Sequence, residues 1–223
     1  MVVNELRVVL EVGPKEKKFV AVARDWPGLE RGAKTPEEAA ARVLEYVPRY
    51  VKVAKLAKRE EGLASVNKVK VLERYPGTGS TDFWGISFAF SNFDQRAMSG
   101  DELERELSLM RACWTYFDQV RSRVSAEMRK GPRGGGRDRE RIVRHTLGAE
   151  LDFAKKLGMP MPEEVITDPK ELKKYRDAYC AAIRRHHGEG SKARSWPVRY
   201  LIRNTAFHVM DHTWEMEDKD MTT

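Results

Sequence analysis

Two histidines four residues apart carry the clearest chemistry in this chain. His208 and His212 lie in the segment 207–215, which has a helical pattern. Positions four apart in an α-helix lie roughly 40° apart around the axis and about 6 Å apart along it, so both imidazoles face the same ion. His145 occupies a corresponding inward position in an earlier helical pattern. Three neutral imidazoles from two helices predict a site for one divalent transition metal, with zinc or nickel preferred.

A site with three protein ligands leaves a coordination position open, which is typical of catalytic metals. A bound zinc-type ion makes its water a nucleophile, polarises a carbonyl or activates a thiolate. Glu215, three residues after His212, is the candidate catalytic carboxylate, acting as a base or holding an imidazole in place. A plain surface charge is the alternative for Glu215 and the favoured interpretation for Asp211 and Glu217.

A structural role for the histidines is the alternative to a metal site. His145 is then a buried polar residue with hydrogen-bond partners, and His208 and His212 form an interfacial pair. His186 and His187 compete as ligands. Because they end a predicted helix, where a positive charge interacts favourably with the helix dipole, we interpret them as a surface cap.

Amphipathic helices are predicted to position the three histidines. Ser99 and Glu102 form a capping box, Asp138 caps the second helix, and Gly158 is a stop signal after it. The glycine-rich segment 131–137 separates the first two helices. The predicted helices span residues 100–128, 139–157, 169–186 and 197–218. Short connections favour an antiparallel four-helix bundle over residues 81–223.

The first 80 residues predict a small α/β module, which makes the fold class α+β. Strands are expected at 6–12, 19–23 and 66–72, and a helix capped by Thr35 is expected at 36–47. Residues 75–82 form a turn-rich linker. The aromatic run 84–90 is either a strand or an apolar segment that packs one half of the molecule on the other.

Composition restricts the classes of protein to which the chain belongs. The net charge of +7 permits an anionic partner, but the basic residues alternate with apolar helix positions, so nucleic-acid binding is not favoured. Cys113 and Cys180 each stand alone and are interpreted as core residues. No apolar run is long enough to span a membrane, and residues 1–7 carry no secretory signal pattern, so we expect a cytoplasmic protein.

Two segments resemble known families. Residues 142–150 around His145, together with residues 207–212, resemble the metal-binding motifs of the DinB/YfiT superfamily, and the resemblance covers residues 97–218. It implies a four-helix bundle, a metal held by His145, His208 and His212, and thiol-dependent transferase, isomerase or hydrolase activity. Residues 26–39, with the turn Trp26-Pro27-Gly28-Leu29, resemble the HicB-like antitoxin module over residues 5–50. That resemblance implies a fold and assigns no functional residue.

The expected function is a metal-dependent enzyme, either a thiol-dependent S-transferase or isomerase or a hydrolase, acting on a small molecule. The expected cofactors are a zinc or nickel ion and a low-molecular-weight thiol. Arg144, Arg203 or the region around Arg137 are candidates for positioning the anionic groups of the thiol, and a solvated helix face is the alternative for each of them. A homodimer is expected. The alternative is a non-enzymatic binding or stress-response protein that contacts a partner through the HicB-like module. Catalysis predicts an open metal site beside a pocket, whereas binding predicts a closed or empty histidine cluster and an exposed patch.

Overall fold

The computed structural model describes residues 5–131 and 135–222 and has an α+β fold. Its sheet contains β1 (Glu5–Val12), β2 (Phe19–Ala23), β3 (Glu30–Ala33) and β4 (Lys68–Pro76) in the order β3-β2-β1-β4. The sheet is mixed, because β4 runs parallel to β1 while the other neighbours are antiparallel. The two strands predicted near the N-terminus are confirmed. The strand predicted at 66–72 lies later, because pairing with the whole of β1 extends it to Pro76, inside the predicted linker.

The helix predicted at 36–47 is α1 (Pro36–Glu45), and a second helix that the sequence did not predict, α2 (Val47–Leu56), follows it. Thr35 caps α1 as expected, since its side chain accepts a hydrogen bond from the Glu38 amide at 3.1 Å. Pro48 lacks an N–H and cannot bond to the carbonyl four residues earlier, so the first helix ends there. The second helix continues at an angle and adds Tyr50 and Val53 to the core.

Four long helices follow the sheet at the predicted places. The helices after β4 are α3 (Gly79–Trp84), α4 (Asn92–Gln95), α5 (Gly100–Arg123), α6 (Arg139–Ala154), the 3₁₀ turn η1 (Lys155–Leu157), α7 (Glu164–Thr167), α8 (Pro169–Gly188) and α9 (Val198–Lys219). The capping box of Ser99 and Glu102 is present, and Gly158 ends η1 in the left-handed region at φ 78°. In the predicted break, Pro132, Arg133 and Gly134 lie outside the described residues.

Two predicted details of these helices are wrong. The first long helix ends at Arg123 instead of Met128, because Val124 takes an extended conformation, although Met128 is still buried. Asp138 precedes α6, but its side chain pairs with Lys130 and does not cap the helix. Both differences arise from the connection between α5 and α6, whose course the helical periodicity does not specify.

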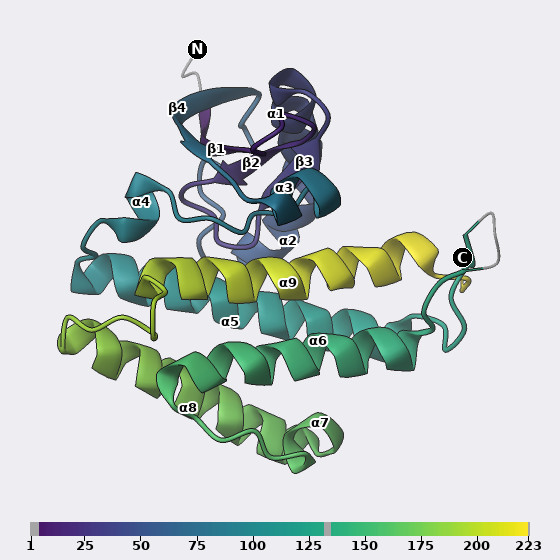
Figure 1. Ribbon diagram of the computed structural model, residues 1–223. Helices are drawn as coiled ribbons and strands as arrows, with labels where there is room; N and C mark the ends of the chain where they lie inside the picture. Colours follow the sequence, from purple (N-terminus) through teal and green to yellow (C-terminus); the bar gives the residue numbers. More distant parts are fainter. Residues whose placement is uncertain (1–4, 132–134, 223) are drawn as a thin grey trace.

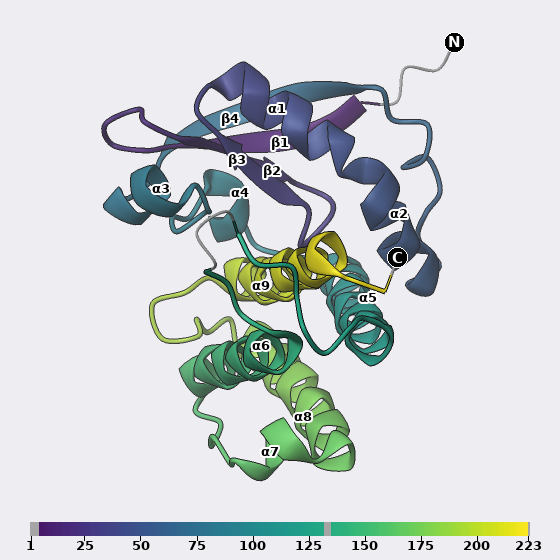
Figure 2. The same cartoon turned by 90° about the vertical axis from the view of Figure 1, so that its right-hand side faces the viewer.

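Helices cover both faces of the sheet. Figures 1 and 2 show α1 and α2 on one side, α3 and α4 on the other, and α9 and α5 between the sheet and the more distant α6 and α8. The run 84–90 is not a strand: after Trp84 it is an irregular segment whose Ala89 packs against Val9, Val20 and Val22. It therefore covers the second face of the sheet. Its Phe90 ring also lies 4.6 Å from the Tyr200 ring of α9 between centroids, so the segment contacts both halves of the molecule, as one of the two sequence interpretations proposed.

The turn at residues 26–29 joins the sheet to the helices. Gly28 has φ +95°, and a Cβ there would lie 3.1 Å from the carbonyl oxygen of Ala206 on α9. The carbonyl oxygen of Pro27 accepts a 2.5 Å hydrogen bond from the buried Tyr50 hydroxyl. Glycine is required here both by the backbone conformation and by the close approach of α9. One continuous hydrophobic core consequently contains residues from the sheet and from the long helices.

A buried ionic cluster provides a second connection between the sheet and α9. The Arg203 guanidinium of α9 binds Asp94 through two hydrogen bonds of 3.0 and 2.9 Å and Glu30 of β3 at 2.9 Å. Burial raises the pKa of Glu30 to about 7 in spite of the opposing charge of Arg203. Glu11 of β1 lies nearby and accepts hydrogen bonds from Ser87 and Thr81. This cluster holds α9 in a fixed position beneath the sheet.

No helix in the described part of the chain combines the length and the apolar composition needed to cross a membrane.

Candidate metal centre

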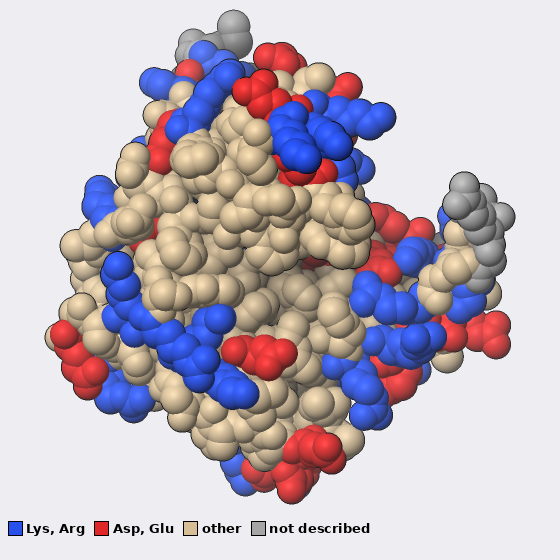
Figure 3. All heavy atoms as spheres, viewed as in Figure 1, with Lys and Arg blue, Asp and Glu red and all other residues tan. Residues whose placement is uncertain are grey.

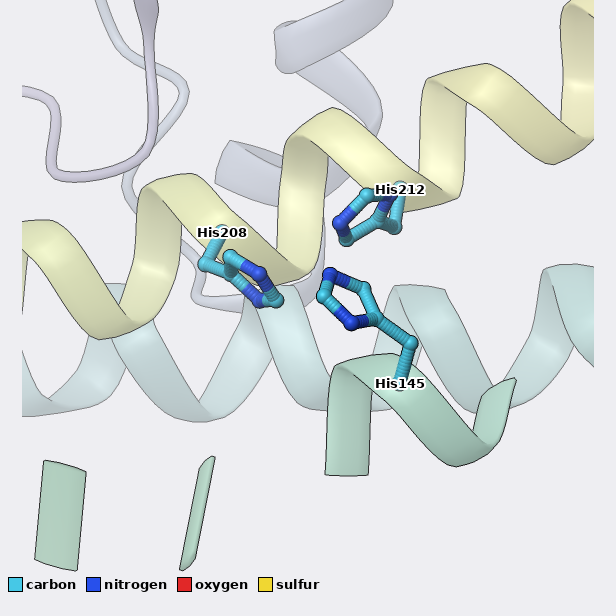
Figure 4. Close-up of side chains that lie close together, drawn as sticks. All are labelled: His145, His208 and His212. Atoms are coloured by element: carbon cyan, nitrogen blue, oxygen red, sulfur yellow. The ribbon is translucent and has the colours of Figure 1, made fainter. Parts of the chain in front are cut away.

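Three histidine side chains converge between α6 and α9. Figure 4 shows His145 pointing from α6 towards His208 and His212 of α9. The ring centroids lie 5.1 Å apart for His145 and His208, and 4.8 Å apart for His145 and His212. Those of His208 and His212 are separated by 4.6 Å. The sequence predicted that these residues would meet, and the structure brings them together.

The three imidazoles fit a single metal ion after a small adjustment. One nitrogen from each ring lies within 4.8 Å of the other two. Three nitrogens at 2.1 Å from a tetrahedral zinc lie roughly 3.4 Å apart, so the nitrogens must approach one another by up to about 1.4 Å. In addition, Nδ1 of His208 is buried without a hydrogen-bond partner in the described structure, which is unusual for a native polar atom.

Glu215 orients one of the three rings. Its Oε2 lies 2.8 Å from Nδ1 of His212, which places the ring proton on Nδ1 and leaves Nε2 free to bind an ion. Arg137 donates to the same carboxylate oxygen at 2.8 Å, and Lys219 donates to Oε1 at 2.7 Å. Carboxylates that hold a metal-ligating histidine commonly have this arrangement.

The electrostatics favour the neutral forms of His145 and His208 and the charged form of Glu215. Burial, with the neighbouring His212, lowers the pKa of His208 to about 3. Burial also lowers the pKa of His145. Burial opposes ionisation of Glu215, but the hydrogen bonds from His212 and Lys219 outweigh it and lower the Glu215 pKa to about 2. Neutral imidazoles have the lone pairs that metal binding requires.

Two solvent-accessible cavities flank the histidine cluster. The first, which we call the sheet-side cleft, has a volume of about 830 Å³ and is lined by His212, Glu215, Arg137 and residues of β3 and α1. The second, which we call the aromatic cavity, has a volume of about 440 Å³. Its lining residues are Ile86, Phe88, Asp152, Phe153, Lys155, Lys156, Arg194, Trp196, Asn204, Phe207 and His208. Both volumes are in the range of small-molecule sites.

The competing carboxylates are used in ion pairs away from the histidine cluster. Asp211 accepts a 2.9 Å hydrogen bond from Arg31, and Glu217 pairs with Arg49 at 2.9 Å. Both contacts connect α9 to the N-terminal part of the chain. Glu217 also accepts from the Tyr116 hydroxyl at 2.6 Å. Glu217, whose side chain is only 12% exposed, is therefore not the plain surface charge that the sequence interpretation favoured.

The competing histidines are likewise bonded elsewhere. A ring nitrogen of His186 lies 3.0 Å from the carbonyl oxygen of Ala182, and one of His187 lies 2.9 Å from that of Met98. Within residues 5–131 and 135–222, neither belongs to a group of three potential ligands.

Several residues around the site were not assigned a role from the sequence. Lys219 follows Glu215 by four residues, and this helical spacing is a usable signal for an ion pair. Arg137 was named only as a general anion-binding residue, and its loop position gives no indication that it reaches Glu215. Trp196 and Lys156 contact each other from separate elements, so no local pattern joins them.

Comparison with protein-family models, with curated proteins and with solved structures gave no match for this chain. The DinB/YfiT and HicB-like resemblances rest on the motifs around His145, His208 and Trp26. In the structure three histidines converge, although His145 and His212 are 67 positions apart in the sequence (212 − 145).

Removing the Glu215 carboxylate is expected to weaken metal binding. The Glu215→Ala variant should bind zinc about 10–100-fold more weakly, because His212 loses the partner that fixes its tautomer. Glu215→Gln should lose less, since its amide oxygen still accepts the ring proton. Competition with a chromophoric chelator measures the affinities. Asp218→Asn, an exposed neighbour on the same helix that pairs with Arg49, is the control. Unchanged affinity in Glu215→Ala would show that this carboxylate does not orient a ligand.

Proposed function

We propose that the chain is a metal-dependent enzyme that holds zinc or nickel through His145, His208 and His212. We further propose that α5, α6, α8 and α9 form a four-helix bundle of the DinB/YfiT kind. The observation that supports this most strongly is the meeting of three imidazoles from two helices beside two open cavities. A purely structural zinc site is closed by a fourth protein ligand, and no fourth candidate belongs to this group among the described residues.

The side chains of the site have separable tasks in this proposal. A bound ion would supply Lewis acidity and a position for water or a thiolate. Glu215 holds the Nδ1 proton of His212 and so directs Nε2 towards the ion. Both of its carboxylate oxygens are already engaged, Oε2 by His212 and Arg137 and Oε1 by Lys219, so neither is free to act as a base. We therefore propose that Glu215 is a positioning residue, although the sequence nominated it as catalytic.

Thiol chemistry at this site requires a thiol from outside the chain. Cys113 and Cys180 are both buried, and neither belongs to the histidine cluster. Burial raises the pKa of Cys180 to about 11 and that of Cys113 still further, so both remain protonated thiols. A low-molecular-weight thiol is accordingly the cofactor that a transferase or isomerase would use here.

The sheet-side cleft provides cations for the anionic groups of such a thiol. Lys18, Lys34 and Arg42 line it, and none of them has an ion pair in the described part of the chain. Arg137 also lines this cleft, whereas Arg203 is enclosed in the buried ionic cluster. The hydrolase variant of the proposal needs no thiol and uses metal-activated water.

Cobalt substitution separates these variants. Cobalt-loaded protein titrated with cysteine, glutathione or bacillithiol should develop a sulfur-to-cobalt charge-transfer band if a thiol reaches the ion. The same protein is assayed for thiol transfer to electrophilic small molecules and for ester hydrolysis. A thiol band with transfer activity supports the transferase or isomerase, and hydrolysis without a band supports the hydrolase. Bound metal with neither result would contradict the enzyme proposal.

An exposed aromatic pair favours a second candidate function. Phe83 and Trp84 at the end of α3 are 69% and 64% exposed, and their ring centroids lie 4.5 Å apart. Exposed aromatic residues are enriched where proteins bind one another. We propose partner binding through the HicB-like part and the adjoining helix α3 as the alternative, in which case Phe83→Ser with Trp84→Ser abolishes a cellular interaction and leaves metal content unchanged.

A further inference from the structure

The aromatic cavity is built from segments that are distant in sequence. Phe153 comes from α6, Trp196 from the loop before α9, and Phe207 and His208 from α9 itself. The Phe153 ring centroid lies 5.9 Å from that of Trp196 and 5.7 Å from that of His208. Aromatic rings therefore form much of the wall, and His208 of the candidate metal centre also lines the cavity.

The rim of this cavity is cationic. Lys155, Lys156 and Arg194 line it, whereas Asp152 is its only carboxylate in the described structure. None of these three cations forms an ion pair among the described residues, although most charged side chains near the histidines do. The ammonium nitrogen of Lys156 lies 3.9 Å from the centroid of the Trp196 ring. Figure 3 shows Lys and Arg side chains gathered beside a hollow with uncharged surface on this face of the molecule.

A tight turn fixes two of the rim and wall residues. Ala193 and Trp196 exchange two backbone hydrogen bonds of 3.0 Å, each donating to the other. Arg194 between them has φ 55°, a left-handed conformation that is uncommon for residues other than glycine, asparagine and aspartate. The turn presents the Arg194 side chain and the Trp196 ring to the same cavity.

We propose that the aromatic cavity binds a small aromatic carboxylate, with its ring against Phe153 and Trp196 and its carboxylate at Lys156 and Arg194. A neutral aromatic molecule would cover these cations without replacing their hydration, whereas a carboxylate pairs with them. The cavity volume of about 440 Å³ suits a single-ring molecule with a short side chain. His208 then faces the bound molecule. The idea that this ligand is a substrate rests on the function proposed above, whereas its binding to the cavity requires no metal.

Matched ligands test the charge preference. Isothermal titration calorimetry on the full chain compares 3-phenylpropanoate with 3-phenylpropanamide, which has the same shape and no charge. We expect the carboxylate to bind at least about tenfold more tightly, because each charge-assisted hydrogen bond contributes appreciably. In the Lys156→Gln, Arg194→Gln double variant, the preference should fall to within about twofold. Lys192→Gln, an exposed cation that does not line the cavity, should retain the wild-type preference.

The aromatic wall is tested separately. Trp196→Ala should weaken binding of the acid and the amide alike, because the ring contact is common to both. Binding of neither ligand to wild-type protein, or a preference that survives in the double variant, would overturn the inference.

Measurements on metal-free and zinc-loaded protein separate this inference from the proposed function. If the protein binds no metal but retains the carboxylate preference, the enzyme proposal fails and the cavity assignment stands. If metal binds at the histidines but the preference is absent, only the cavity assignment fails.

Discussion

Replacing both His208 and His212 by alanine is expected to abolish metal binding. Tag-free wild-type protein should carry close to one equivalent of zinc or nickel after reconstitution and dialysis, and the double variant should carry close to none. The reason is that α9 supplies two of the three ligands from one rigid helix, so that only His145 remains on α6. A single imidazole binds these ions too weakly to retain them through dialysis. Inductively coupled plasma mass spectrometry measures the metal content.

The matched control is His186→Ala with His187→Ala, which also removes two imidazoles from one helix. These rings contact backbone carbonyl groups and not the cluster, so metal content should stay at the wild-type value. Thermal unfolding provides a second measurement. A metal present at 1,000 times its Kd stabilises the folded state by about 4 kcal/mol, so zinc should raise the Tm of the wild type and the control only. An absence of metal in reconstituted wild-type protein would contradict the proposed site.

The histidine cluster could be predicted because its geometry is largely local. His208 and His212 share a helix face through their spacing of four, and the apolar row around His145 directed that residue towards α9, although His145 is exposed where the sequence predicted an inward position. To predict the contact between α6 and α9, it was then enough to assume that the inward faces of the two helices pack against each other. Glu215 was recognisable for the same reason, since a residue three positions from His212 lies on nearly the same face.

The buried carboxylates could not be predicted from local patterns. Glu11 and Glu30 sit at or near strand ends, where charged residues normally reach solvent. They are buried because the irregular segment around Ser87 and Ala89 covers the second face of the sheet. That segment has no periodicity of its own, so its position depends on tertiary contacts, including the hydrogen bond from Ser87 to Glu11.

At the end of α5, residues remain buried although the helix has already ended. Val124 and Met128 continue the apolar stripe and are buried, yet both lie beyond the last helical residue, Arg123. The Arg139 side chain donates to the carbonyl oxygen of Val124 at 2.9 Å, and the backbone of Ser125 donates to Asp220 at the same distance. Contacts with distant residues thus replace the helical hydrogen bonds. An apolar repeat predicts which residues are buried more reliably than it predicts where a helix ends.

The Arg203→Met variant is expected to be strongly destabilised. Methionine fills similar space but leaves Asp94 and Glu30 buried without their cation. Breaking a buried pair in this way costs about 3–5 kcal/mol of the free energy of unfolding, because an uncompensated charge remains in the interior. Urea unfolding at neutral pH, followed by circular dichroism, measures the change.

Arg184→Met is the matched control for this measurement. Arg184 also binds a carboxylate through two hydrogen bonds, of 2.6 and 2.7 Å to Glu104, but its side chain is 43% exposed. Exposed pairs contribute about 0–1 kcal/mol, so this variant should unfold close to the wild type. If the two variants lost the same free energy of unfolding, the buried Arg203 would contribute no more to stability than the exposed Arg184, which would contradict the prediction.

A second substitution tests whether unpaired charge is the cause. Adding Glu30→Gln to Arg203→Met removes one of the two unpaired carboxylates and should recover part of the lost stability. Because Arg203 lies five residues before His208 on α9, the cluster also fixes the helix that carries two metal ligands. Loss of metal binding in Arg203→Met that is regained with Glu30→Gln would show that the ionic cluster positions the metal centre as well as stabilising the fold.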